Sequence, residues 1–585
     1  MKAEHLSEQL AGAAYTHSLI DTEELMKPEV SRGDFLLAVT GEAIVQTIPG
    51  ADLESDSVDG ERYESFSLPG DVIKKVHDKK THEILLESEI TPADYERQAE
   101  ALGPEHVRAA RLAKHLTNRL KDALDGRAIE EVSSTGKGGG VQMILMALGN
   151  YMQKSGVDWH WRLLDNMDQI ATKTKMWHNT YQGVRNPSID MLDESFAQYD
   201  KWIEQRAQNL RGPLTNAALI RPHDPQPHGL VKYARLWNPD APIAAWSHIQ
   251  NRSDLIGTPG SSPEHLWERM YRTSWSMVDA ISFHPVLSFI PDSARNEQVL
   301  FTPATFDTFD DLNRRNLTEQ ERQEGRDFLD WRLALSAEIK AENQFAKVET
   351  DWTQTGIDWN RPIITLIARF DPSKGMEVSM AAYAKARARM VAEGVSLEKI
   401  PQLVLMGNGA PDDTDGESEL SRIMNERYEN YPDIMHDVKV GRVPHNDTAL
   451  NVLMDESKFG LQSSLFEGFE TRVSDWIWHG KPVIGSKRGG IPTQIIEGRS
   501  GFVADPSDID LWASHIYDLS TNEQMYEDMC HWSDKLGKSY NYLEFSTVAS
   551  VIRQAELYVE LLEGTFQGSR NRPWKVGEKL EAYGF

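Results

Sequence analysis

The sequence has almost no cysteine and no long apolar run. Its one cysteine among 585 residues, Cys530, excludes an intrachain disulfide framework and is typical of a reducing compartment. No stretch approaches the roughly 18 apolar residues that a membrane-spanning helix needs. The first residues also lack the apolar core of a secretory signal. We therefore expect a cytoplasmic protein with no membrane partner.

Basic side chains are also scarce relative to acidic ones. The chain carries 62 Lys and Arg against 90 Asp and Glu, for a net charge of -28. Nucleic acid needs a basic footprint, so it is excluded as the main partner. A small anionic ligand remains compatible, because a few local cations or a helix N-terminus can hold a phosphate inside an acidic protein.

Strands alternate with helices in two series along the chain. The first contains "AIEEVSS", "VDWHWRLL", "NAALIRP" and "APIAAWSHI"; the second begins at "RPIITLIARFDPSKG" and continues through "PQLVLMGNG" and "GKPVIGSK". Such alternation predicts parallel sheets covered by helices. The expected fold class is therefore α/β, with two Rossmann-like domains that face each other and a ligand cleft beyond the strand ends.

Four segments are expected. Residues 1–125 form an N-terminal extension, with strands near "DFLLAVTGEAIVQTI" and helices from residue 90, compatible with an oligomerisation module and a homodimer. Residues 126–350, which end in a charged helical spacer, form the acceptor-side domain, and residues 351–545 form the donor and phosphate domain. Residues 546–585 form a closing helix and tail. Its predicted packed face comprises Val548, Val551, Ile552, Ala555, Val559 and Leu562.

A glycine-rich segment, "SSTGKGGGV", follows the first strand of the first series. Gly138, Gly139 and Gly140 allow close backbone approach, and the helix that follows offers free N–H groups to an anion. The segment is neither a Walker loop nor a dinucleotide fingerprint. A plain tight turn is the alternative interpretation.

Cations and carboxylates stand at two strand ends of the second series. Arg369 and Lys374, five residues apart in "RFDPSKG", can converge on a phosphate. Glu467 in "LFEGFETRVSD" is expected at a strand-to-helix turn, where its carboxylate can accept hydrogen bonds from sugar hydroxyls and stabilise positive charge at an anomeric carbon. Asp475, two turns along the helix, is expected either to approach a distant part of the ligand or to be a solvated helix acid.

Two histidines follow strands of the first series. His223 lies in "RPHDPQP" and His248 in "WSHIQNRSDLI". Each can hydrogen-bond a sugar, and each can equally cap a strand end.

Taken in order, these blocks resemble a known family. The second series is similar to retaining glycosyltransferases of the GT-B architecture, family 4, in which an Arg and a Lys hold donor phosphate and a Glu-x7-Glu element follows. Closer still, "HNTYQGV", "HDPQP", "SHIQNRSDLI", "ARFDPSKG", "EGFETRVSD" and "GKPVIGSKRGGIPTQI" resemble the configuration-retaining trehalose phosphorylases of fungal type and the related trehalose synthases. The resemblance covers about residues 130–560.

The resemblance implies an activity and a set of roles. The activity is reversible phosphorolysis of trehalose, or a similar small α-glucoside, to α-glucose 1-phosphate and glucose. Sugar and phosphate would be the only substrates, with no cofactor and no metal. Arg369 and Lys374 would bind phosphate, Glu467 would hold the transferred glucose and His223 would contact the sugar 6-hydroxyl. The remaining substrate-binding positions would be Gly138, Gly139, Gly140, Asp224, His248, Arg252, Gly468, Phe469 and Asp475.

Three alternatives stay open. The first is a retaining glucosyltransferase that uses a nucleoside diphosphate glucose. One residue argues against it: in nucleotide-sugar enzymes the second Glu of the family element binds the ribose, and in this chain that position is the shorter Asp475. Gln250, where the synthases tend to carry Asp, leaves the substrate open. The others are a sugar-nucleotide 2-epimerase and an inactive binding protein.

Overall fold

The computed structural model describes residues 62–65, 72–136, 139–342, 355–407, 416–443 and 446–585. The chain divides into two compact units, residues 1–63 and 64–585, and the fold below is that of the second unit. The strands expected near residues 34–48 and the glycine at 138 lie outside the described residues. Among the described helices, none is both long and apolar enough to cross a membrane.

The first domain is built on a mostly parallel sheet. Its order runs β2-β3-β5-β4-β6, and isolated parallel bridges from β6 to β7 continue it into β7-β8-β9. β2 and β3 form an antiparallel hairpin that pairs with β5 at one side. The strands are β2 Ile73–Asp78, β3 Glu83–Ser88, β4 Ile129–Ser133, β5 Trp159–Leu163, β6 Leu219–Pro222, β7 Ala244–Ser247, β8 Ala280–Phe283 and β9 Val299–Phe301.

Helices connect these strands and cover the sheet. Pro92 and Pro104 stand at the first turns of α3 and α4, where proline fits because its missing N–H would have no helical partner. From residue 72 on, the N-terminal extension therefore supplies two strands and two helices to this domain. The helices are α3 Pro92–Leu102, α4 Pro104–Leu124, α5 Gly139–Lys154, α6 Ala171–Tyr181, α7 Ile189–Asn209, α8 Arg211–Asn216, α9 Leu230–Trp237, α10 Ser253–Ile256 and α11 Ser262–Thr273.

The second domain has a fully parallel sheet in the order β12-β11-β10-β13-β14-β15. All five residues of β10 are buried, as expected for a strand covered on both faces. The strands are β10 Ile363–Ile367, β11 Gln402–Gly407, β12 Val438–Arg442, β13 Phe459–Gln462, β14 Val483–Ser486 and β15 Gly501–Ala504. The helices are α12 Glu319–Glu342, α13 Met376–Ala392, α14 Gly416–Asn430, α15 Asp447–Glu456, α16 Thr471–Trp478, α17 Ile491–Gln494, α18 Ile509–Thr521 and α19 Glu523–Leu536.

The charged spacer is helix α12, and it packs against α15 and β12 of the second domain. Leu329 and Leu333 are fully buried in the apolar cluster that also holds Val404 and Met406 of β11. Because this buried face belongs to the second domain's core, the domain boundary lies ahead of α12 rather than at residue 350.

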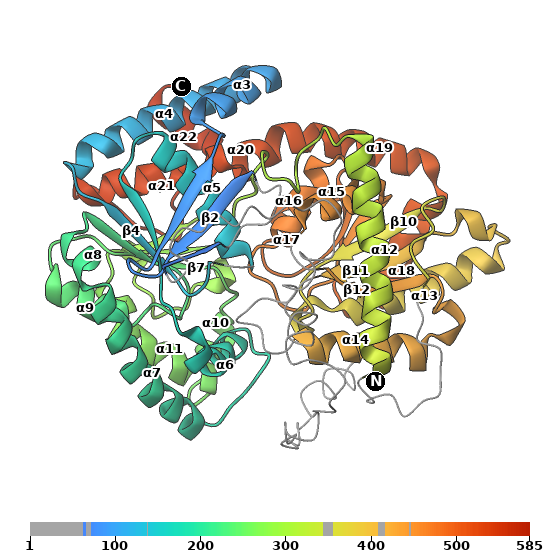
Figure 1. Ribbon diagram of the computed structural model, residues 1–585, viewed down its shortest axis with the longest axis horizontal. Helices are drawn as coiled ribbons and strands as arrows, with labels where there is room; N and C mark the ends of the chain where they lie inside the picture. The colour runs from blue at the N-terminus through green and yellow to red at the C-terminus, as the bar shows by residue number, and fades with distance from the viewer. Residues whose placement is uncertain (1–61, 66–71, 137–138, 343–354, 408–415, 444–445) are drawn as a thin grey trace. The chain divides into compact units, whose positions relative to one another are not determined.

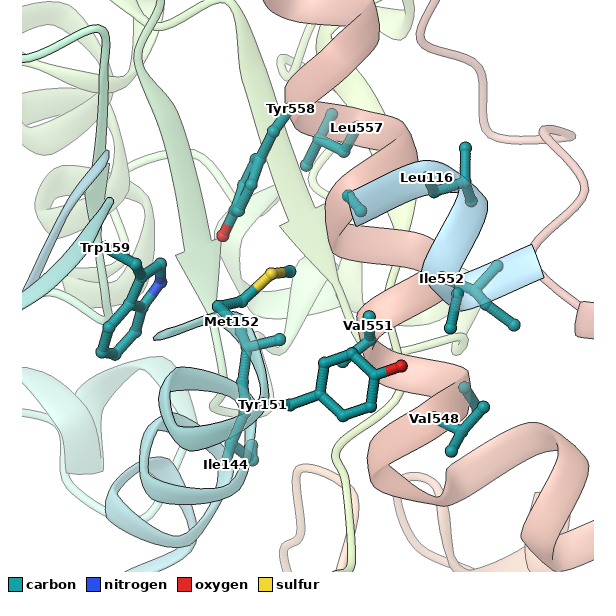
Figure 2. Close-up of a cluster of buried hydrophobic side chains, with 14 of the residues drawn as sticks. Leu116, Ile144, Tyr151, Met152, Trp159, Val548, Val551, Ile552, Leu557 and Tyr558 are labelled. Atoms are coloured by element: carbon teal, nitrogen blue, oxygen red, sulfur yellow. The ribbon is translucent and has the colours of Figure 1, made fainter. Parts of the chain in front are cut away.

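The chain then returns to the first domain. After α20 (Tyr542–Phe545), helix α21 (Thr547–Leu562) packs against α4 and α5, and α22 (Val576–Tyr583) follows (Figure 1). Figure 2 shows Val548, Val551 and Ile552 of α21 facing Tyr151 and Leu116. The predicted closing helix is confirmed, and burial of its apolar face holds it against the first domain.

Each parallel sheet has one point where its strand order reverses direction. In the second domain this point lies between β10 and β13, and in the first between β4 and β6. The two loops that leave the strand ends at such a point diverge and open a crevice for ligands. The candidate residues predicted from the sequence all follow these four strands, except His248 and Arg252, which follow β7.

Candidate active site

A cleft of about 280 Å³ is lined by both domains. The loops from the two switch points meet in it, which confirms the expected facing arrangement. The first domain contributes Gly140, Lys175, His178, His223, Asp224 and His248, and the second contributes Arg369, Lys374, Glu467, Gly468, Phe469, Glu470 and Arg472, among other residues.

Lys374 and two glutamates form the ionic centre of the cleft. Lys374 ends a short 3-10 turn after β10, and the following Gly375 takes a left-handed φ of 60°. The Lys374 ammonium donates to Glu467 Oε2 at 2.5 Å and to Glu470 Oε2 at 2.7 Å. The sequence-predicted pair of Lys374 and Glu467 is thus brought into direct contact.

The Glu467 carboxylate is held by three donors. Besides Lys374, the backbone N–H of Gly468 donates to Oε1 at 2.9 Å and the Ser464 hydroxyl donates to Oε2 at 3.1 Å. Burial, with help from the neighbouring Glu470, raises the pKa of Glu467 to about 7 although Lys374 opposes the shift. Burial also opposes the charge of Lys374, but its two carboxylate partners outweigh burial and raise its pKa.

Glu470 is a site residue that the sequence analysis missed. Its backbone lies in the left-handed region at φ 64°, which is uncommon outside glycine and costs on the order of 1–3 kcal/mol. Its side chain caps α16 by accepting from the Arg472 N–H at 3.4 Å. Burial would raise its pKa, but Lys374, Glu467 and Arg472 together outweigh burial and lower it. The only sequence signal was a second glutamate three residues after the first.

A buried ion pair crosses the cleft. Lys175 on α6 of the first domain donates to Asp371 Oδ2 of the second domain at 2.9 Å. Burial would raise the pKa of Asp371, but Lys175 and then Arg369, 3.9 Å away, lower it strongly. Asp371 also holds the turn before Lys374, because its Oδ1 accepts from the Ser373 N–H at 2.9 Å.

Three cations, each near a carboxylate, gather at this end of the cleft. Burial, together with the nearby charges of Lys175, Arg369 and Lys374, lowers the pKa of His178 to about 3. His178 is therefore neutral among three cations that come from both domains. Such a cluster suits an anion with several oxygens, such as phosphate.

Apart from Lys175 and Asp224, the first-domain wall presents uncharged polar side chains. His248 and His223 both line it, and His223 has only 1% of its surface exposed. Both ring nitrogens of His223 are engaged, Nε2 with Glu131 Oε2 at 2.5 Å and Nδ1 with His248 Nε2 at 2.9 Å. His223 therefore has no ring nitrogen to offer a sugar, contrary to the role that the resemblance implied, because β6 ends with this side chain turned into the core.

Asp224 also lies at the cleft. Its φ of 65° lets its Oδ1 accept a hydrogen bond from the backbone N–H of His248 at 2.7 Å, which holds the loops after β6 and β7 together.

The two walls of the cleft also contact each other. A Cβ on Gly468 would lie 2.3 Å from the His248 carbonyl oxygen, and Gln250 Oε1 accepts from the Glu467 N–H at 2.9 Å.

The other predicted positions divide into two groups. Gly140 and Phe469 line the cleft, and Gly139 begins α5 beside it. Asp475 is fully buried away from the cleft lining, where Asn313 Nδ2 donates to it at 3.0 Å and Arg472 pairs with it at 2.8 Å. Arg252 does not line the cleft either; it pairs with Asp254 at 2.6 Å on the surface.

Two family models match the chain. Residues 131–287 match "Trehalose synthase, N-terminal domain", and residues 348–531 match "Glycosyl transferases group 1". Together they cover both sides of the cleft.

Individual proteins with related names are also similar in sequence to this chain. Trehalose phosphorylase of Pleurotus pulmonarius is 32% identical over 72% of this chain and 57% of its own length, and that of Grifola frondosa is 33% identical over 69% and 54%. Trehalose synthase of Pyrococcus horikoshii is 28% identical over 65% of this chain and 79% of its own. The chain thus spans little more than half the length of these two phosphorylases.

Solved structures support the fold alone. The N-terminal domain of Candida albicans trehalose-6-phosphate phosphatase superposes with a TM-score of 0.51 at 13% identity, over 75% of this chain and 97% of the other. An Escherichia coli protein bound to UDP-2-fluoro glucose superposes with a TM-score of 0.50 at 15% identity, over 74% and 99%. With its two switch-point loops meeting in one cleft, the chain belongs to the GT-B glycosyltransferases related to the trehalose phosphorylases and trehalose synthases.

Proposed function

We propose that this protein is a retaining α-glucosyl phosphorylase, which reversibly converts trehalose or a similar small α-glucoside and phosphate into α-glucose 1-phosphate and glucose. The observation that carries the proposal is the cluster of Lys175, Arg369 and Lys374 beside Glu467 and Glu470. The relatives named trehalose phosphorylase support the same assignment.

The cations would bind the phosphate and stabilise its charge during transfer. Arg369 can contact two phosphate oxygens at once, and Lys374 adds a compact charge. A clamp of this kind contributes about 3–4 kcal/mol for each donor, by comparison with oxyanion sites. The carboxylates beside Lys374 fix its position before substrate arrives, so little reorganisation is needed.

Glu467 would accept hydrogen bonds from hydroxyls of the transferred glucose. Its carboxylate also faces the region where positive charge develops as the glycosidic bond breaks. In a front-face displacement, the anomeric carbon–oxygen bond breaks and a bond to a phosphate oxygen forms on the same face. The phosphate proton passes to the departing glucose oxygen, so the reaction needs no protein nucleophile and no cofactor.

Asp475 favours phosphate over a nucleotide as the group bound here. In the nucleotide-sugar enzymes of the family that this chain resembles, the residue at this position binds the ribose. In this chain its carboxylate is occupied by Arg472 and Asn313 inside the core, with no exposed surface. A nucleoside would therefore lack that contact.

A second candidate is a retaining glucosyltransferase that uses a nucleoside diphosphate glucose. The relatives named trehalose synthase favour it, because this chain covers 79% of the length of one of them, more than it covers of the phosphorylases.

One assay separates the two candidates. We expect purified protein with trehalose and phosphate to release α-glucose 1-phosphate, detected with phosphoglucomutase coupling. Release of nucleoside diphosphate from UDP- or ADP-glucose with glucose as acceptor, without phosphorolysis, would overturn the proposal in favour of the second candidate. A Lys374→Ala variant serves as the negative control, because it lacks a cation that the proposal places on the phosphate.

A further inference from the structure

Glu470 stands between the cation cluster and helix α16. It lines the cleft, and 7% of its side chain is exposed. Its Oε2 accepts from the Lys374 ammonium at 2.7 Å, and its Oε1 accepts from the backbone N–H of Arg472, in the first turn of α16, at 3.4 Å. One carboxylate thus joins the lysine of the proposed phosphate site to the start of a helix.

Lys374 has little donor capacity left for a ligand. An ammonium carries three N–H donors. Glu467 takes one and Glu470 takes another, so at most one N–H remains for a phosphate oxygen. Arg369, whose charge acts on Lys374, can make a bidentate contact to the same phosphate. These donors suffice for one phosphate group, and Lys374 has none to spare for a second.

The start of α16 is engaged in the same way. Backbone N–H groups at a helix N-terminus bind phosphates well. Thr471 and Arg472, the first residues of α16, both line the cleft, but the Arg472 N–H already donates to Glu470. Glu470 therefore holds a lysine N–H and a helix N–H that a second phosphate, bonded to the first, would otherwise use.

Glu470 is ionised there, and its backbone is strained. Burial would raise its pKa, but Lys374, Glu467 and Arg472 together lower it. Its φ of 64° is a conformation that glycine adopts freely and that other residues adopt at a cost. Glycine would fit the turn with less strain, so the turn itself does not account for a glutamate at this position.

We propose that Glu470 is a specificity-determining residue that restricts the cleft to a single phosphate group. A sugar monophosphate fits, because its phosphate needs only Arg369 and the remaining N–H of Lys374. The second phosphate of a diphosphate, as in a nucleoside diphosphate sugar, would meet the ionised Glu470 carboxylate and is rejected by repulsion between like charges. The inference rests on the proposed function in one respect, that the cation cluster is where phosphate binds.

Two variants separate the charge of Glu470 from its volume. Glu470→Gly removes the carboxylate, frees the Lys374 and Arg472 N–H groups and suits the left-handed backbone. Glu470→Gln keeps the volume and removes only the charge. Glu429→Gln is the matched control, because it removes the same charge from an exposed position on α14.

The first test compares inorganic phosphate with inorganic pyrophosphate, by calorimetric titration without divalent cations. The wild type and Glu429→Gln should bind pyrophosphate about tenfold or more weakly than phosphate, although pyrophosphate carries more charge. Pyrophosphate bound as tightly as phosphate by the wild type would overturn the proposal, and this outcome needs no variant to fold. A wild type that binds neither anion would overturn it too, because the cluster would then not be a phosphate site.

In the variants the ratio of the two affinities should change. Glu470→Gly should shift it toward pyrophosphate by about tenfold or more, the effect of a hydrogen bond to a charged group. Glu470→Gln should shift it in the same direction by less, because the amide still fills the space. An equal gain for both anions, or an unchanged ratio in a Glu470→Gly protein whose circular dichroism matches the wild type, would refute a role in selectivity.

The assay of the proposed function keeps the two failures apart. If the wild type releases no α-glucose 1-phosphate from trehalose and phosphate while Glu470→Gly gains pyrophosphate binding, the proposed function fails and the role of Glu470 stands. If the wild type releases α-glucose 1-phosphate and the affinity ratio is unchanged in Glu470→Gly, the proposed function stands and the role of Glu470 fails.

Discussion

The two walls of the cleft are built alike and charged differently. Each follows strands at the switch point of a parallel sheet, and each holds one non-glycine residue in the left-handed region, Asp224 in the first domain and Glu470 in the second. The second-domain wall is ionic, with Lys374 between two carboxylates. The first-domain wall presents neutral His248 backed by a hydrogen-bond chain.

The contrast indicates that the two walls have different roles in binding the substrate. Fixed charges stabilise a phosphate and a developing positive centre, which requires ions held in advance. Neutral hydrogen-bonding groups recognise hydroxyls, where an ion would bring a desolvation cost without gain. Two first-domain residues differ from this pattern: Lys175 pairs with Asp371 of the second domain and joins the two walls, and the carboxylate of Asp224 accepts the His248 N–H.

The largest expected effect comes from removing the ionic centre. Lys374→Ala should lower kcat for phosphorolysis about 10³-fold, because it removes a phosphate donor and the counter-ion of two buried carboxylates. Initial rates of α-glucose 1-phosphate release measure it. Lys385→Ala, which removes an exposed lysine paired with Asp510, should leave kcat unchanged. Equal losses in both variants would contradict the assignment.

Breaking the link between the walls should destabilise the protein. Lys175→Met leaves Asp371 buried without this partner and should cost about 3 kcal/mol in stability, seen as a lower midpoint of urea unfolding. Because the pKa of Asp371 is lowered in the folded state, its contribution is present above the ordinary carboxylate pKa. The difference between wild type and variant should therefore narrow as the pH falls.

A double variant sharpens this test. Lys175→Met with Asp371→Asn removes both charges and should recover part of the lost stability. If the double variant is as unstable as the single one, the pair is not what joins the walls.

The pH profile should report Glu467. Its raised pKa of about 7 means that it is protonated, and unable to accept from hydroxyls at that oxygen, below this pH. We expect kcat/KM for trehalose to fall as pH decreases through 7, approaching tenfold per pH unit. In Glu467→Gln the rate should be lower throughout and this acidic limb should disappear. A limb that persists in the variant belongs to phosphate ionisation instead.

The smallest effect is expected at Arg252. Its surface pair with Asp254 should contribute less than about 1 kcal/mol to stability, and its position away from the cleft should leave kcat/KM within about threefold after Arg252→Ala. A larger loss would show that the substrate reaches beyond the described cleft to Arg252, one of the substrate-binding positions that the resemblance implied.

Local sequence was sufficient for most of the ionic wall, although it did not single out Glu470. Arg369, Lys374 and Glu467 stand in short motifs next to strongly apolar strands, and the strand ends alone place them at the edge of the sheet. The same reasoning predicted α3, α4, α5 and α21 from their periodic apolar faces, and prolines also mark the starts of α3 and α4.

Contacts between distant segments required the structure. Nothing local to Lys175 or Asp371 indicates that they pair across 196 positions, and nothing local to Glu131 indicates His223 92 positions away. The orientation of His223 into the core and of Asp475 toward Asn313 likewise depends on packing between elements.

The sequence by itself determined the two alternating series, the loops at their strand ends and the residue types in those loops, because periodicity and turn chemistry act over a few residues. Only the tertiary structure decided which of those side chains share the cleft and which protonation each one holds, because burial and partner charges come from elements distant in the sequence, such as Lys374 and Glu467, 93 positions apart, and Lys175 and Asp371, 196 positions apart.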